Sequence, residues 1–176
     1  MKYLLLIILT IFSNLSHSQN LVEIENQLLI LVNNERSERS LTAFDLDTLI
    51  NNGAKIQADY LSTVRSIYQI THDNPNPNHS TPSKRIRVAS DLKYSISNEN
   101  ITAFTYDSTQ TDLEMAQRIH DNFMGSKPHR LMVLREVPDV FNDGWVPASS
   151  YGHIVVYNKS ANLIIAVQMF PTKNYD

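Results

Sequence analysis

The feature that most constrains this chain is the absence of cysteine from all 176 residues. No disulfide can cross-link the fold, so a hydrophobic core must stabilise it. A chain of this length is long enough to bury such a core. The same absence excludes a thiol nucleophile, a thiolate metal site and a lipid-modified cysteine anchor. Any chemistry must therefore use histidine, carboxylate or hydroxyl groups.

The first residues have the pattern of a signal peptide. Lys2 precedes an apolar run over residues 4–12, and small residues follow before Gln19. An apolar run of about nine residues is well short of the roughly 20 that a spanning helix needs, which argues against a retained membrane anchor. We predict cleavage after Ser18, with residues 19–176 as a single domain. The mature chain is then exported, extracellular or periplasmic, with no stable membrane anchor.

The charge balance argues against nucleic acid as a partner. The chain has a formal charge of -3, and loss of Lys2, the one charged residue in residues 1–18, takes this charge to -4. No run of Lys or Arg forms a basic stripe that could follow a phosphate backbone.

The first two thirds of the chain have the periodicity of helices. Apolar residues recur at helical spacing over residues 21–39 and again over residues 48–66. Three further helices are predicted by start signals, namely a Thr-Pro pair, a capping box and a proline in a first turn. These signals stand at Thr81, Thr111 and Pro128.

Extended segments dominate the end of the chain. Residues 98–104 already look extended, and after the fifth helix the same pattern covers residues 140–146, 151–157 and 163–170. The turn at residues 158–162 joins the last two segments as an antiparallel hairpin. Helices early and strands late, without regular alternation, indicate an α+β fold rather than a doubly wound sheet.

Three separate stretches carry residue types suited to binding or catalysis. His72 opens a polar, proline-rich loop at residues 72–80, and Glu99 lies in an extended segment. His129 falls in the first turn of the fifth helix, where the positive helix end disfavours the imidazolium and favours a neutral ring. Each stretch alone also has a plain interpretation as solvated surface.

Further motifs stand around these stretches, and the full series in chain order is Asn33-Asn34-Glu35-Arg36, Phe44-Asp45 with Leu49, His72, Pro82-x-x-Arg85, Glu99-Asn100-Ile101, Phe123-Met124-x-Ser126-x-Pro128-His129-Arg130, Gly144 and Val167-Gln168-x-Phe170. Taken in this order, the motifs resemble the CAP superfamily of cysteine-rich secretory proteins, antigen 5 and plant pathogenesis-related proteins, whose domain is also called SCP. The resemblance spans about residues 26–170 and looks closest to the cysteine-free bacterial branch. It implies a three-layer α-β-α sandwich with a central antiparallel sheet and an open cleft.

Many members of this superfamily line the cleft with two histidines and two glutamates, and the histidines can hold a divalent metal such as zinc. By resemblance, His72 is the first histidine, Glu99 the first glutamate and His129 the second histidine. Ser126 stands where the second glutamate would fall. We therefore predict a cleft lined by His72, Glu99, Ser126 and His129, in which His72 and His129, together with Glu99, are the candidate metal ligands.

The missing second glutamate weakens the case for a metal. Two histidine nitrogens and at best one oxygen remain, whereas a catalytic zinc usually has three protein ligands and an open position for water. Glu99 can instead orient a histidine through a hydrogen bond. A serine mechanism built on Ser126 and His129 lacks a visible third member and an oxyanion site.

Three functions remain open, and the first is favoured. It is a non-catalytic secreted binding module whose cleft takes a peptide, a lipid or a cell-envelope component, since one fold can serve many roles. The second is a metal-assisted hydrolase, with water activated by a metal on the two histidines and Glu99 as base. The third is a purely structural network in which the histidines and Glu99 join the helices to the sheet.

Overall fold

The computed structural model describes residues 20–135 and 150–173. The predicted signal peptide at residues 1–18 and the predicted strand at residues 140–146 lie outside the described residues, so both stay predictions. Within the described ranges the chain forms five α-helices, one short 3-10 helix and four strands.

Five helices begin close to the positions that the sequence predicts. Their bounds are α1 Leu21–Ser37, α2 Thr48–Leu61, α3 Pro82–Ala89, α4 Asp112–Gly125 and α5 Lys127–Leu134. The Thr81 hydroxyl accepts a hydrogen bond from the Lys84 amide, and Thr111 and Glu114 form both bonds of the capping box. The start signals are thus confirmed. No helix in these described ranges has the length and apolar character needed to cross a membrane.

α2 ends at Leu61, earlier than the predicted residue 66. The reason lies in a distant side chain, because the Asn158 amide donates hydrogen bonds to the carbonyls of Leu61 and Val64 at 3.1 Å and 2.7 Å. A buried side chain therefore adds a second hydrogen bond to the Leu61 carbonyl, which the Val64 amide also bonds at 3.3 Å, and gives the Val64 carbonyl a partner. The chain then turns into the 3-10 helix η1 Ile67–Gln69.

The four strands form one sheet in the order β1-β3-β4-β2. The strands are β1 Asp45–Leu46, β2 Tyr94–Thr105, β3 Ser150–Asn158 and β4 Leu163–Lys173. β4 is antiparallel to both β2 and β3, so the predicted β3–β4 hairpin is confirmed. Among the strands in the described ranges, only β1 departs from the predicted antiparallel pattern, because its two residues run parallel to β3.

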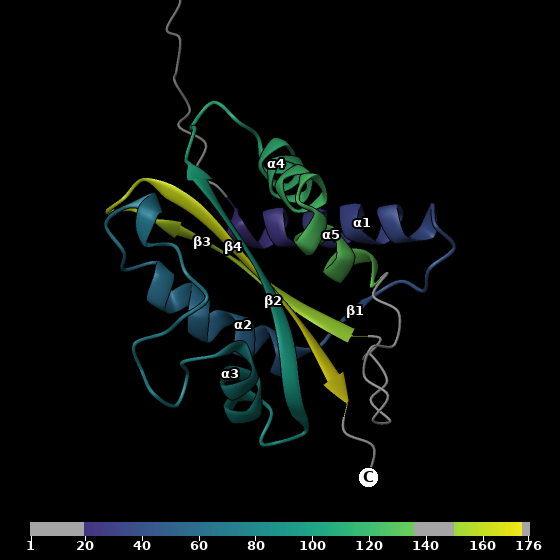
Figure 1. The fold of residues 1–176 in the computed structure, drawn as a ribbon. Helices are drawn as coiled ribbons and strands as arrows, with labels where there is room; N and C mark the ends of the chain where they lie inside the picture. The colour runs from purple at the N-terminus through teal and green to yellow at the C-terminus, as the bar shows by residue number, and fades with distance from the viewer. Residues whose placement is uncertain (1–19, 136–149, 174–176) are drawn as a thin grey trace, which may run out of the picture.

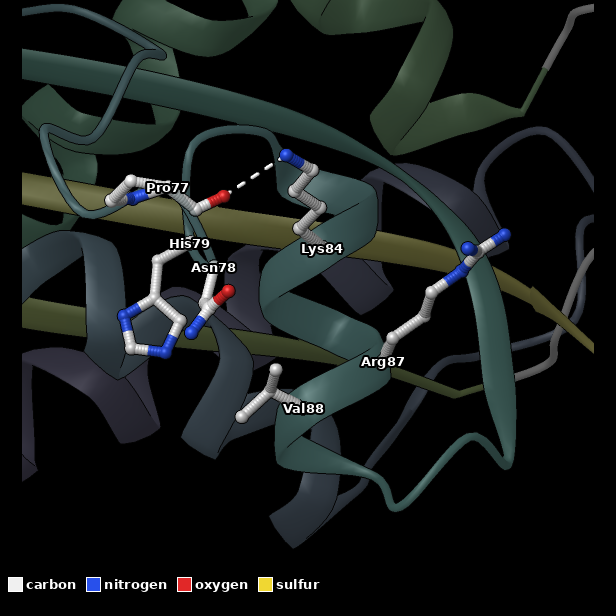
Figure 2. Close-up of a pocket in the computed structure, with 6 residues that line it drawn as sticks. All are labelled: Pro77, Asn78, His79, Lys84, Arg87 and Val88. Carbon is white, nitrogen blue, oxygen red and sulfur yellow. Dashed lines mark hydrogen bonds between the residues drawn. The ribbon is translucent and has the colours of Figure 1, made fainter.

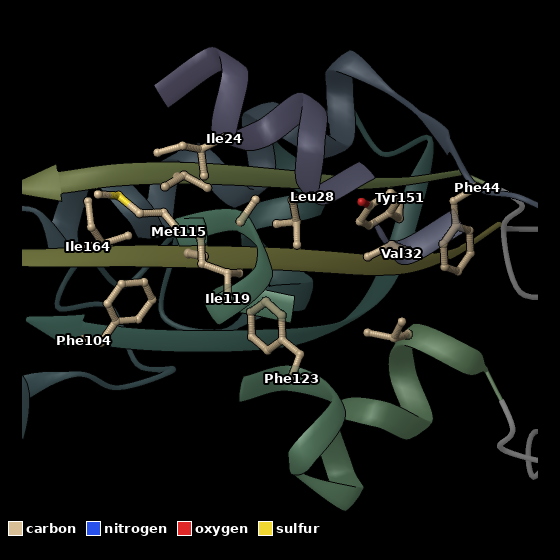
Figure 3. Packing of buried hydrophobic residues seen from close by; sticks show 14 of the residues in the cluster. Ile24, Leu28, Val32, Phe44, Phe104, Met115, Ile119, Phe123, Tyr151 and Ile164 are labelled. Atoms are coloured by element: carbon tan, nitrogen blue, oxygen red, sulfur yellow. The ribbon is translucent and has the colours of Figure 1, made fainter. Parts of the chain in front are cut away.

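Helices cover both faces of the sheet, as Figure 1 shows. α1, α4 and α5 pack on one face, and α2 and α3 pack on the other. Alternation along β4 sends Ile164 and Ala166 into the first core and Ile165 and Val167 into the second. Figure 3 shows the first core, where side chains of α1 and α4 meet over the strands. The predicted three-layer α-β-α sandwich is confirmed.

β2 lies at one edge of the sheet, with β4 as its strand neighbour. Along β2, Ile101 belongs to the core under α2 and α3, whereas Phe104 belongs to the core under α1 and α4. The same alternation directs Glu99 toward the α3 layer and Asn100 toward the α5 layer. Neighbouring residues of the Glu-Asn-Ile triplet therefore direct their side chains to opposite faces of the sheet.

Candidate functional site

A buried ion pair between Arg85 and Glu99 forms the base of the candidate site. Arg85 Nη2 lies 2.6 Å from Glu99 Oε2, and neither side chain has any exposed surface. Arg85 is held by α3, whose first turn is fixed by the Thr81 cap and by the bond from the Arg85 amide to the Thr81 carbonyl. Glu99 comes from β2, so the pair joins α3 to the edge strand.

Arg85 also holds the two ends of the proline-rich loop. Its Nη1 donates to the carbonyl of His79 at 2.8 Å and to that of His72 at 3.3 Å, and its Nη2 also reaches the His72 carbonyl at 3.3 Å. From α2, Gln57 Nε2 donates to the Thr71 carbonyl at 2.7 Å. Residues 72–80 are exposed for the most part, as predicted for a surface loop, but both ends are tied to the core.

His72 is oriented by Glu99. Its Nδ1 lies 3.0 Å from Glu99 Oε1, and 53% of its side chain is exposed. An ionised carboxylate can only accept hydrogen bonds, so Nδ1 carries the proton and donates it. In the neutral ring, Nε2 is then an acceptor, and no residue in the described part of the chain is hydrogen-bonded to it.

His129 approaches β2 from the opposite layer. Its backbone carbonyl accepts a 3.0 Å hydrogen bond from Asn100 Nδ2, which also donates to Gln168 Oε1 at 3.2 Å. The ring packs edge-on against Phe123, with centroids 5.6 Å apart. Burial, and to a lesser degree the charge of nearby His72, lowers the pKa of His129. The neutral form that the helix position favours is thus favoured by the surroundings as well.

Ser126 lies at the junction between α4 and α5. It is the C-cap residue of α4 and the N-cap residue of α5, and its side chain makes no capping hydrogen bond to α5. Its backbone carbonyl accepts a bond from the Arg130 amide at 2.8 Å. The hydroxyl is therefore not used to start α5.

The structure brings His72 and Glu99 into direct contact and places His129 near enough to interact electrostatically with His72. Arg85 is the central residue that the sequence did not single out, although it stands in the Pro82-x-x-Arg85 motif. In residues 20–135 and 150–173, no group of three or more His, Asp or Glu side chains could hold a metal ion. Glu99 fits the role of orienting His72 better than that of a metal ligand.

A hollow of about 330 Å³ lies beside these residues rather than among them. Figure 2 shows its walls, formed by the loop and by α3. Lys84, one of the lining residues, donates from Nζ to the Pro77 carbonyl at 2.9 Å. The lining residues are Pro77, Asn78, His79, Lys84, Arg87 and Val88. The hollow shares the loop with the candidate site and gives the α3 side of the site a basic border.

Two solved structures have a similar fold. An outer surface protein from Borrelia burgdorferi matches with a TM-score of 0.66 and 17% identity, over 90% of this chain and 99% of that chain. An extracellular protein containing an SCP domain from Bacillus anthracis str. Ames matches with a TM-score of 0.53 and 22% identity, over 83% of this chain and 39% of that chain. This chain therefore has the CAP/SCP-like fold that its motifs predict.

Comparison of the sequence with protein-family models and with curated proteins gave no match.

The substitution Arg85→Met tests the ion pair. It should lower the free energy of unfolding by about 3–5 kcal/mol, because it leaves the Glu99 carboxylate buried without its cation. The double variant Arg85→Met/Glu99→Gln should recover part of that loss, since the charge is removed as well. Urea unfolding of the wild type, both single variants and the double variant measures this coupling.

A matched control for this cycle is Lys55→Met. Lys55 pairs with Asp59 on the surface, where 57% of each side chain is exposed, so its loss should cost less than about 1 kcal/mol. Strictly additive losses for Arg85 and Glu99, or a loss for Arg85→Met as small as the control, would contradict the role given to the pair.

Proposed function

We propose that this chain is an exported, non-catalytic binding protein that holds its ligand at His72, Glu99, Ser126 and His129. One observation carries the proposal: both carboxylate oxygens of Glu99 are already engaged, one by His72 Nδ1 and the other by Arg85. A general base needs an oxygen within hydrogen-bond reach of the proton that it removes. Glu99 therefore serves to hold His72 and Arg85 in a fixed geometry rather than to act as the general base of a hydrolase.

The groups that remain free suit binding. His72 presents a half-exposed ring whose Nε2 accepts hydrogen bonds when the ring is neutral. The lowered pKa of His129 favours a neutral ring there too. Ser126 adds a hydroxyl that is not needed as a helix cap. This set matches a polar group of a peptide, a lipid head group or a cell-envelope component.

Two observations support export. The first residues have the pattern of a cleaved signal peptide. The two similar structures belong to an outer surface protein and to an extracellular protein. We infer that the mature chain works outside the cytoplasm, in the extracellular or periplasmic space.

A metal-assisted hydrolase is the second candidate, because a carboxylate that orients a histidine is a common arrangement around bound metals. His72 and His129 would be the ligands. A catalytic zinc usually takes three protein ligands, and the described residues offer no such group. The residues therefore fit a catalytic zinc poorly, and we assign no reaction step to a metal.

Binding can be tested with the chain from residue 19 onward on an array of phospholipids, cell-wall glycan fragments and short peptides. We expect one class of probe to bind the wild type and to lose affinity for a His72→Ala/His129→Ala variant. The matched control is His79→Ala, which removes a ring from the same loop but leaves the backbone carbonyl that Arg85 holds. Equal binding by the double variant, or no binding at all, would contradict the proposal.

Zinc titration of the metal-free chain by calorimetry separates the two candidates. With two histidine ligands we expect weak binding and no turnover of ester or peptide substrates. A tight, stoichiometric zinc complex that disappears in His72→Ala/His129→Ala and is accompanied by hydrolysis would replace the binding proposal with the hydrolase.

A further inference from the structure

The hollow between α3 and the proline-rich loop is not used by the proposed function. It measures about 330 Å³, at the lower end of the roughly 300–1,000 Å³ that small-molecule sites occupy. Figure 2 shows three side chains of α3 and three loop residues around it. The hollow therefore has room for a compact ligand.

The α3 wall of the hollow is basic. Lys84, Arg87 and Val88 are spaced at i, i+3 and i+4, so they share one face of the helix. Lys84 and Arg87 carry positive charge, and none of the described residues that line the hollow is acidic. The lining itself, and not a distant helix, therefore favours an anion.

No carboxylate neutralises this charge within the described ranges. Neither Lys84 nor Arg87 forms an ion pair there. Asp91 follows Arg87 by four residues, a spacing that pairs charges on a helix, but α3 ends at Ala89 and the two side chains do not pair. Glu99, which lies under α3, is bound by Arg85 instead.

Both cations are held in place and still have donors to offer. Lys84 Nζ donates to the Pro77 carbonyl at 2.9 Å and to Ser80 Oγ at 3.1 Å, and Arg87 Nε donates to the Ser95 carbonyl at 2.9 Å. An ammonium has three N–H donors and a guanidinium has five, so these bonds use two of the first and one of the second. Side chains that are ordered before a ligand arrives lose less entropy when it binds.

The loop wall is fixed through its backbone. The Asn78 amide donates to Asn76 Oδ1 at 3.0 Å, and the His79 amide donates to the Asn76 carbonyl at 2.9 Å. The His79 carbonyl accepts from Arg85 Nη1 at 2.8 Å. The side chains of Asn78 and His79 form no hydrogen bond with any other described residue. Their N–H groups therefore add donors to a wall that is already positioned.

We propose that this hollow binds the phosphate group of a phosphate monoester. Such a group carries about -1.5 to -2 charges near pH 7 and three acceptor oxygens, which match two cations and several N–H donors better than a single carboxylate does. The Arg87 guanidinium can hold two oxygens, and Lys84 adds a point charge. Val88, 57% exposed, gives the carbon part of the ester an apolar surface.

Calorimetry with glycerol phosphate tests the ligand class on the chain from residue 19 onward. Binding should be at least about tenfold tighter than for acetate, should be absent for glycerol, and should weaken as salt is added. Equal affinity for acetate, or no binding of glycerol phosphate, would overturn the proposal.

The substitution Arg87→Gln tests the site itself and should weaken binding of glycerol phosphate at least about tenfold. The matched control is Arg65→Gln, which changes the net charge equally at an exposed arginine outside the hollow and should leave binding unchanged. If Arg87→Gln disturbs α3 through its lost bond to Ser95, Lys84→Gln replaces it. Equal affinities of the hollow variant and the control would reduce the effect to net charge and refute the site.

Nitrogen-15 NMR locates the contact. Addition of glycerol phosphate should shift the Arg87 Nε signal and the backbone amides of Asn78 and His79, and it should leave the Arg65 Nε signal in place. Shifts confined to residues outside the hollow would place the phosphate elsewhere and contradict the inference.

Two sources of the phosphate group can be distinguished by sedimentation with vesicles. Vesicles of phosphatidylcholine with phosphatidic acid carry a phosphate monoester, and vesicles of phosphatidylcholine alone do not. Sedimentation with the first only, lost in Arg87→Gln, would assign a lipid head group. Binding of glycerol phosphate without sedimentation would assign a soluble ester, and binding of neither would overturn the proposal.

This site and the histidine site fail separately. The variant His72→Ala/His129→Ala should bind glycerol phosphate as tightly as the wild type does. If that variant loses the phosphate while Arg87→Gln keeps it, the ligand belongs to the two histidines and the inference about the hollow is wrong, whereas the proposed binding function stands.

Discussion

The arrangement of the site depends on the buried ion pair between Arg85 and Glu99. Removing two charges from water costs several kcal/mol for each ion, and attraction offsets this only when further hydrogen bonds satisfy the remaining groups. Here Arg85 donates to the carbonyls of His72 and His79, and Glu99 accepts from the His72 ring, while the buried Arg85 Nε has no partner among the described residues. The ion pair therefore fixes the loop, the edge strand and the orientation of one histidine together.

The two histidines belong to opposite layers of the sandwich, and one edge strand contacts both. Glu99 contacts His72 on the α3 side, and the next residue, Asn100, contacts the His129 backbone on the α5 side. Two adjacent residues of one edge strand thus hold both halves of the site.

Local signals in the sequence predicted much of this fold. The caps at Thr81 and Thr111 depend on residues three positions away, and the final hairpin depends on a short turn, so each can be recognised in one stretch. The end of α2 could not be predicted, because it depends on Asn158, 97 residues after Leu61. The parallel pairing of β1 is likewise a product of tertiary packing.

The site was predictable only through resemblance to a family. His72 and Glu99 are 27 residues apart, and no periodicity relates them. The central role of Arg85 depends on how three segments meet, so its motif position alone did not reveal it. The missing second glutamate was visible in the sequence as Ser126, and it removes one candidate oxygen ligand from the predicted metal site.

The central claim is that Glu99, held by Arg85, fixes His72 with its proton on Nδ1 and leaves Nε2 free for a ligand. Nitrogen-15 NMR of the imidazole, recorded where the ring is neutral, reports the tautomer directly. The account predicts that His72 is protonated at Nδ1 and that Glu99→Ala shifts the ring toward the Nε2-protonated form. A wild-type ring protonated mainly at Nε2, or a mixture that Glu99→Ala does not change, would contradict it.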